Sequence, residues 1–577
     1  MTSRTPRDTF SRSSLLLLGG LSGVLAFQGG CAIVGSSSGS NGATVSGGSA
    51  QVCIGCSTIA PETIAQLKAQ GITEAALNQF FKELGRNNIA PEALDHELRD
   101  IAKNYLDLKT KIATFSSEDP EVAKLTQQAR QAVEAVNFPL AERLFNEASQ
   151  RDEQAAQNLQ QVATARLTSA AAAQAANGDL QRVQLNFVNA QAYYRKALQL
   201  LPPSDTEHRG PYLILLGISL NEAGIRAKGP DIQKSFRDAV AAYREALTVY
   251  TKEQFPRQWA RIQNNLGLVL QSQGTRTSGE AGMSLLAEAG SAYREALTIY
   301  TKEQFPRQWA RIQNNLGNVL VDQGIRTSGE VGMSLLAEAD SAYREVLAVV
   351  TKEQFPQDWA GTQNNLGAVL TEQGIRTGGE AGTCLLGNAV QAYRDALTVR
   401  TKEQLPQDWA GTQNNLGSVL RAQGIRTSGE TGTHLLGDAV QAYNAALTIY
   451  TKAQLPQQWA LTQSNLGAVL HVLGIRISGE AGTRSLAESV TAYREALTVY
   501  TKEQLPQDWA RTHYNLGNVL LDQGARTGGE AGKVLIRQAI NAYELALEVR
   551  TREALPVQWE QTMSNLKAAK KGLEDMK

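Results

Sequence analysis

The chain has few of the residues that build catalytic or metal sites. Its 577 residues include four cysteines and five histidines, and the histidines are scattered along the sequence. Four cysteines are too few for a disulfide-stapled scaffold. The sequence has no phosphate-binding glycine-rich loop, no H-E-x-x-H zinc motif and no G-x-S-x-G nucleophile motif. We therefore expect no catalytic residue, no metal site and no cofactor, and we predict that the chain is not an enzyme.

An excess of charge of either sign is also missing. Lysine and arginine together number 56, which equals the 56 aspartates and glutamates. Binding to nucleic acid depends largely on basic side chains that neutralise phosphates. The charge balance therefore gives no reason to expect a nucleic-acid partner.

The first thirty residues have the pattern of an export signal. Arg4, Arg7 and Arg12 precede an apolar run at residues 15–27, and two glycines then lead to Cys31. The apolar run is shorter than the ~20 residues that a membrane-spanning helix needs. A basic start followed by a short apolar core is typical of a secretory signal peptide.

The cysteine directly after the two glycines resembles the cleavage site of a bacterial lipoprotein. This resemblance implies a signal peptide at residues 1–30 and lipidation of Cys31, with Gln28 departing from the apolar residue that the family prefers. We therefore expect a lipoprotein anchored to the membrane of the bacterial cell envelope, on its periplasmic face. An uncleaved anchor, an ordinary secreted protein and a cytoplasmic protein are the alternatives.

A Gly/Ser-rich linker is predicted at residues 31–57. Such a tract buries too little apolar surface to fold, so it acts as a disordered tether. Cys53 and Cys56 form a lone C-x-x-C, which lacks both a second pair of zinc ligands and the strand that precedes a thioredoxin-like site. A local disulfide or two idle thiols are the simpler readings. A small helical region is expected at residues 58–118.

A repeat of 50 residues dominates the rest of the chain. Tyr243 recurs every 50 residues to Tyr543, and all seven tryptophans, from Trp259 to Trp559, occupy one position of the repeat. A fixed period of this size indicates an array in which each unit buries its apolar face against its neighbours.

Each repeat is predicted to form two antiparallel helices. In one unit, Pro256 fits the first turn of a helix, and apolar residues recur at helical spacing until Gly274 ends it. A loop follows at residues 275–282, and a second helix is expected at about 284–304. The loop carries Arg276 and a capping-box spacing, T-x-x-E, so we expect both to cap helix ends.

The residues Leu266-Gly267 and Ala289-x-x-x-Tyr293-x-x-Ala296 resemble the tetratricopeptide repeat. That family has about 34 residues per repeat, and the additional residues of this chain lie in the two connections. The long form is similar to the repeats of bacterial multidomain signalling proteins and of the kinesin-light-chain group. The resemblance implies an all-α fold, an α-solenoid of helix pairs in a right-handed superhelix. We expect degenerate copies at residues 119–209, seven repeats at 210–555 and a capping helix at 556–577.

One asparagine recurs in every first helix. In the kinesin-light-chain-like families the matching asparagine bonds the backbone of a peptide in the concave groove, so the resemblance implies this role here. The alternative is that the amide fixes the spacing of the units. The candidate groove residues are Asn265, Asn315, Asn365, Asn415, Asn465 and Asn515.

The leading interpretation is a non-enzymatic scaffold that binds a peptide or protein in the groove of the array. One alternative is a structural component of an envelope complex. Another is the cytosolic sensor half of a signalling system. The positions beside the asparagines vary, as local selectivity or drift after duplication would produce.

Overall fold

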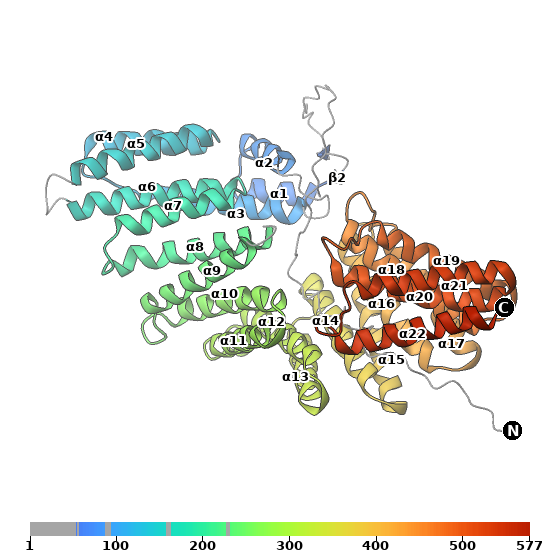
Figure 1. Ribbon diagram of the computed structural model, residues 1–577. Coiled ribbons are helices and arrows are strands. Elements are labelled where there is room, and N and C mark those ends of the chain that lie inside the picture. Colours follow the sequence, from blue (N-terminus) through green and yellow to red (C-terminus); the bar gives the residue numbers. More distant parts are fainter. Residues whose placement is uncertain are drawn as a thin grey trace. The chain divides into compact units, whose positions relative to one another are not determined.

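The computed structural model describes residues 53–54, 57–59, 61–86, 94–156, 163–226 and 231–576 (Figure 1). The expected signal peptide, Cys31 and most of the linker lie outside these residues, as does Cys56. The described residues contain 22 helices and one pair of two-residue strands. The strands β1 (Cys53–Ile54) and β2 (Ser57–Thr58) pair antiparallel, at the end of the predicted linker.

The chain divides into two compact units, whose described parts are residues 53–319 and 320–576. The helices that precede the division are α1 (Pro61–Ala69), α2 (Glu74–Arg86), α3 (Leu94–Ala113), α4 (Pro120–Glu134), α5 (Phe138–Ala156), α6 (Ala163–Val183), α7 (Phe187–Leu200), α8 (Thr206–Arg226), α9 (Asp231–Val249), α10 (Pro256–Thr275) and α11 (Gly279–Leu297). Helix α12 (Pro306–Arg326) passes from one unit to the other.

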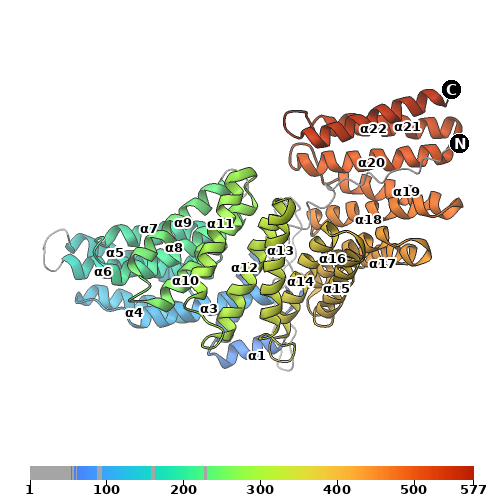
Figure 2. The same cartoon turned by 90° about the horizontal axis from the view of Figure 1, so that it is seen from below.

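The helices of the second unit alternate between a longer first helix and a shorter second helix. They are α13 (Gly329–Leu347), α14 (Pro356–Arg376), α15 (Gly379–Leu397), α16 (Pro406–Arg426), α17 (Gly429–Leu447), α18 (Pro456–Arg476), α19 (Gly479–Leu497), α20 (Pro506–Thr527), α21 (Gly529–Leu547) and α22 (Pro556–Asp575). The first helices of successive pairs, from α14 to α22, lie side by side (Figure 2).

Helices α10 and α11 show how each pair packs. Gly274, near the end of α10, lies against Leu286, near the start of α11. At the other end of the pair, the hydroxyl of Tyr300 donates a 3.1 Å hydrogen bond to the carbonyl of Arg257. The two helices are therefore antiparallel, as predicted, and the fold is an all-α array of helix pairs packed in series.

A glycine and a tyrosine meet in the middle of α10 and α11. A Cβ on Gly267 would stand 2.7 Å from the ring of Tyr293, so only glycine lets the two helices approach this closely. The same contact joins Gly178 of α6 to Tyr194 of α7. These two residues are 16 positions apart in the sequence, whereas Gly267 and Tyr293 are 26 apart. The ten additional residues of the long pairs therefore lie between these two positions, and α6 with α7 packs as a short version of the same pair.

The predicted bounds of the second helix are wrong. Helix α11 covers Gly279–Leu297 and not 284–304. It begins early because Gly279 takes a φ of +67°, a left-handed conformation that turns the chain directly into the helix. It ends at Leu297, and in the turn before α12 the hydroxyl of Thr301 accepts from the backbone N–H of Gln304.

The predicted capping box is also absent from α11. The hydroxyl of Thr277 donates to the carbonyl of Gln273 at 2.9 Å, and Ser278 stands at the N-cap without a side-chain bond. The threonine therefore satisfies the end of α10 and leaves the start of α11 uncapped by a side chain.

Helix α3 agrees closely with the prediction at residues 93–112. Its apolar positions are all buried: Leu94, Leu98, Ile101, Tyr105, Leu108 and Ile112. It packs against α6, where Lys111 forms a 3.0 Å ion pair with Asp179. The hydroxyl of Tyr105 donates to the carbonyl of Val133 at the end of α4. The first three helices therefore share one core with α4 to α6.

Candidate functional site

The six candidate asparagines lie at the same position of six first helices. They belong to α10, α12, α14, α16, α18 and α20. Cys31, the predicted lipidation site, lies outside the described residues.

The asparagine amides join consecutive first helices. The Nδ2 group of Asn415 donates to Oδ1 of Asn364 at 3.3 Å, and that of Asn465 donates to Oδ1 of Asn414 at 3.2 Å. In both cases the acceptor lies in the previous repeat, at the position directly before the recurring asparagine. These amides therefore contribute to the spacing of the units, one of the two roles that the sequence leaves open. A primary amide has two N–H groups, so this bond uses part of its donor capacity.

The exposure of these asparagines differs along the array. Asn415 and Asn365 are 4% and 8% exposed, whereas the other four are half-buried. A ligand that approaches the first helices therefore reaches the asparagines less easily in the middle of the second unit than near its end.

One strip of each first helix keeps contact with solvent. On α18 it consists of Leu461, Asn465, Ala468 and Val472, all half-buried, at the spacing that places residues on one helix face. We call these four positions, and their equivalents at 50-residue steps on α14, α16 and α20, the accessible strip. Most of the equivalents are half-buried too, whereas Asn365 and Glu372 on α14 and Asn415 on α16 are buried. Apart from the asparagine, its side chains differ from helix to helix.

The third position of the strip also contacts the buried tyrosine of the pair. The hydroxyl of Tyr443 lies 2.9 Å from Oγ of Ser418, and that of Tyr543 donates to Oδ1 of Asn518 at 2.8 Å. Burial raises the pKa of both phenols above the ordinary value. These hydroxyls therefore stay protonated and act as structural hydrogen-bonding groups.

The sequence identifies the recurring loop arginine but not its partner. Arg376 donates from Nη1 to the carbonyls of Gly324 and Thr327, at 2.9 and 2.8 Å. Those carbonyls end the first helix of the preceding pair, where backbone acceptors lack intrahelical donors. Arg426 and Arg476 bind the equivalent carbonyls of their preceding pairs. The arginine thus links consecutive repeats at these three positions, whereas Arg276 bonds the end of its own helix as predicted.

The last pair departs from the pattern. Tyr514 stands where α14 and α16 have asparagine, and its hydroxyl accepts from Nδ2 of Asn565 at 3.1 Å. The guanidinium of Arg550 lies 4.4 Å from the centroid of the Tyr514 ring and is 6% exposed. Burial lowers the pKa of Arg550 to about 10. Aromatic stacking and burial therefore close the end of the array.

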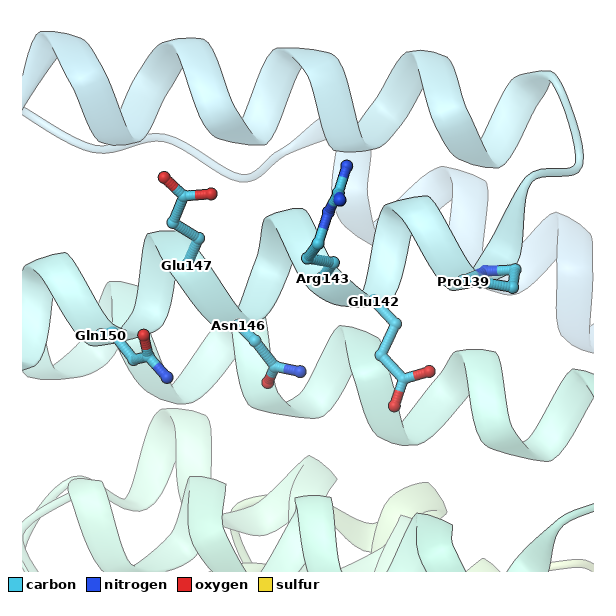
Figure 3. Close-up of a pocket in the computed structure, with 6 residues that line it drawn as sticks. All are labelled: Pro139, Glu142, Arg143, Asn146, Glu147 and Gln150. Carbon is cyan, nitrogen blue, oxygen red and sulfur yellow. The ribbon is translucent and has the colours of Figure 1, made fainter.

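A shallow hollow of about 520 Å³ lies on α5 in the first unit (Figure 3). It is lined by Pro139, Glu142, Arg143, Asn146, Glu147 and Gln150. Its central polar groups are already engaged, because Asn146 accepts from Asn177 at 2.9 Å and Glu142 accepts from Tyr193. The hollow offers no converging set of free groups for catalysis.

In the part of the chain that the structure describes, no group of three or more His, Cys, Asp or Glu side chains lies together in a way that would hold a metal ion. No helix among the described residues has the length and apolar character needed to cross a membrane.

No protein-family model matches the chain, and no curated protein matches it. Among solved structures, the chain is similar to BtubC (BKLC) from P. vanneervenii, with 20% identity and a TM-score of 0.29 over 45% of this chain and 92% of that chain. Yeast Tom70 gives 12% identity and 0.33 over 79% and 97%. The apo form of RapI gives 12% and 0.37 over 75% and 98%. Similarities this remote carry no argument about what this chain binds.

Proposed function

We propose that this protein is a non-enzymatic scaffold that binds a peptide or protein along the accessible strip of its first helices. The strip carries the proposal because the rest of each first helix is largely committed to packing between neighbouring helices. A constant amide beside variable positions suits a ligand whose backbone is held generally and whose side chains are selected locally.

The composition of the strip supports a protein ligand. Its first position is Gly361, Gly411, Leu461 and Arg511 in successive first helices, and its third is alanine, serine, alanine and asparagine. This mixture of small, apolar and basic groups offers shape and polar contacts without the basic excess that nucleic acid needs.

We propose further that lipidated Cys31 anchors the protein to the membrane. This part rests on the sequence of residues 1–57, namely the basic start, the apolar run, the cysteine and the Gly/Ser-rich tether. A tether after a lipid anchor gives the array the reach to meet a partner beside the membrane.

A site-specific photo-crosslinking experiment tests the binding face. A benzophenone amino acid replaces Ala468 on the strip of α18, and in a matched variant it replaces Thr491, which is exposed on the second helix α19. We expect a cross-linked partner from position 468 and none from position 491 in cells that express the full chain. Capture from position 491 alone would favour the alternative of a structural component that assembles through its second helices.

A further inference from the structure

Gly361 occupies an unusual place on the accessible strip. It lies inside α14 with helical backbone geometry. The equivalent residue is again glycine at Gly411, and it has a large side chain at Arg261, Arg311, Leu461 and Arg511. A glycine inside a helix costs about 1 kcal/mol relative to alanine. A Cβ at this position would meet only Nη2 of Arg400, at an ordinary distance of 3.6 Å. Neither the backbone nor close packing requires the glycine, so its effect is to leave space over Arg400.

Arg400 lies in the turn after α15 and extends between α14 and α16. Among the described residues its side chain makes one hydrogen bond, from Nη1 to Oγ1 of Thr412 at 3.0 Å, and no ion pair. Burial lowers the pKa of its guanidinium, partly offset by the charge of Asp408. A partly desolvated cation without a bonded carboxylate is costly unless a ligand supplies one.

The equivalent arginine of the last pair is closed off. Arg550 makes the same bond, to Oγ1 of Thr562 at 3.1 Å, but the ring of Tyr514 covers it and Arg511 replaces the glycine. Arg400 is half-buried, and Asn364 stands where Tyr514 stands in the last pair, so no aromatic ring of the described residues covers its guanidinium. The same repeat position therefore holds two arginines: Arg550, which an aromatic ring covers, and Arg400, which a ligand can approach.

Arg400 is held through Thr412. The hydroxyl of Thr412 accepts from Nη1 of Arg400 and donates to the carbonyl of Asp408 at 2.8 Å. Its Oγ1 also lies 3.3 Å from Oδ1 of Asn364, which accepts from Nδ2 of Asn415 at 3.3 Å. These contacts fix Thr412, and through it Arg400, between α14 and α16. The guanidinium is thus held in place before a ligand arrives, which reduces the entropy that binding costs.

We propose that Arg400, approached through the space over Gly361, binds a carboxylate of the partner peptide. A guanidinium with free N–H groups binds a carboxylate through two parallel hydrogen bonds. The inference deepens the proposed function and rests on it, since it names the chemistry of one subsite on the same strip. The carboxylate belongs either to an acidic side chain or to the C-terminus of the peptide.

Random-peptide display against the immobilised full chain is the test. We expect selected peptides to share an acidic residue or an acidic C-terminus, and this preference to disappear with Arg400→Gln but persist with Arg550→Gln. A selected peptide should bind Arg400→Gln about 10- to 100-fold more weakly than the wild type. Gly361→Leu, which copies Leu461, should weaken binding similarly while the cation stays.

The outcomes separate the two proposals. Selected peptides without an acidic preference, or with one that survives in Arg400→Gln, would overturn the carboxylate subsite and leave the scaffold function standing. No selected peptide at all would overturn the proposed function and the subsite with it. Arg400→Tyr, which copies Tyr300 and Tyr450, keeps the test open if the glutamine variant fails to fold. Amidating the C-terminus and changing Glu to Gln in the peptide then identify which carboxylate binds.

Discussion

Nη1 of Arg476 donates a 2.7 Å hydrogen bond to the carbonyl oxygen of Gly424, which lies 52 residues earlier in the chain. Further bonds reach the carbonyls of Thr427 and Ile425. One side chain thus satisfies partly buried carbonyls at the end of the preceding first helix, and together with the bond from Asn465 to Asn414 it couples two consecutive repeats.

Replacing Arg476 with methionine should lower the free energy of unfolding by about 1–3 kcal/mol, because partly buried carbonyls lose their donors. The urea midpoint, followed by circular dichroism, measures the effect. Arg526 gives a matched control, since among the described residues its side chain makes one such bond, at 3.2 Å to the carbonyl of Ile477. Equal losses for Arg476→Met and Arg526→Met would show that the carbonyl bonds do not stabilise the array.

Two glycines of the second unit should respond to alanine with opposite signs. A Cβ on Gly367 would lie 2.8 Å from the ring of Tyr393, so Gly367→Ala should destabilise the protein by about 1–3 kcal/mol. Gly437 lies inside α17 with nothing within 4 Å of its Cβ position. Gly437→Ala should therefore stabilise the protein by about 0.5–1 kcal/mol. Thermal melts of the two variants suffice, and a shared sign would contradict the account of the glycine–tyrosine contact.

The helix pairs could be predicted from the sequence because their determinants are local. Pro256 starts a helix, Tyr293 and its flanking alanines form one face, and the 50-residue period shows that each unit stacks on a copy of itself. The position of Gly267 opposite Tyr293 follows from the same pattern.

The links between units could not be predicted in the same way. Whether Arg376 bonds its own helix or the carbonyl of Gly324 depends on how two pairs stack, which no local pattern encodes. The same holds for Asn415, whose acceptor Asn364 belongs to another unit. The start of α11 was misplaced because the left-handed φ of Gly279 depends on a tight connection and not on helix propensity.

His513 should make stability fall as the pH is lowered. Burial lowers its pKa to about 4, against 6.5 for the free side chain, and its Nδ1 is buried without a hydrogen bond. Between pH 6.5 and 4, His513 is protonated in the unfolded state and neutral in the folded state. The free energy of unfolding therefore decreases as the pH falls through this range. The loss is at most about 1.4 kcal/mol per pH unit.

The comparison with His513→Gln isolates that effect, since glutamine stands at this position in other units. The difference in urea midpoint between wild type and variant should change between pH 7 and pH 5, to the disadvantage of the wild type. A constant difference would mean that His513 titrates alike in the folded and unfolded states.

Two of the recurring asparagines separate the structural role of this position from its proposed binding role. Asn415 is buried and bonded to Asn364, so Asn415→Ala should cost about 1 kcal/mol of stability. Asn515 is half-buried, and its side chain makes no hydrogen bond among the described residues. Asn515→Ala should leave the melting temperature unchanged and weaken the binding of a displayed peptide that contacts α20. If the affinity for every selected peptide is unchanged, the recurring asparagines serve only to fix the spacing of the repeats.

The predicted anchor has a direct chemical test. Cells that express the full chain are grown with labelled palmitate beside cells that express Cys31→Ser, and both are fractionated. We expect label and membrane association for the wild type and neither for the variant, because the lipid is attached through the Cys31 sulfur. A membrane-bound but unlabelled wild type would indicate an uncleaved apolar segment at residues 15–27. An unlabelled protein in the cytosol would contradict export, and partners of the accessible strip would then be sought among cytoplasmic proteins.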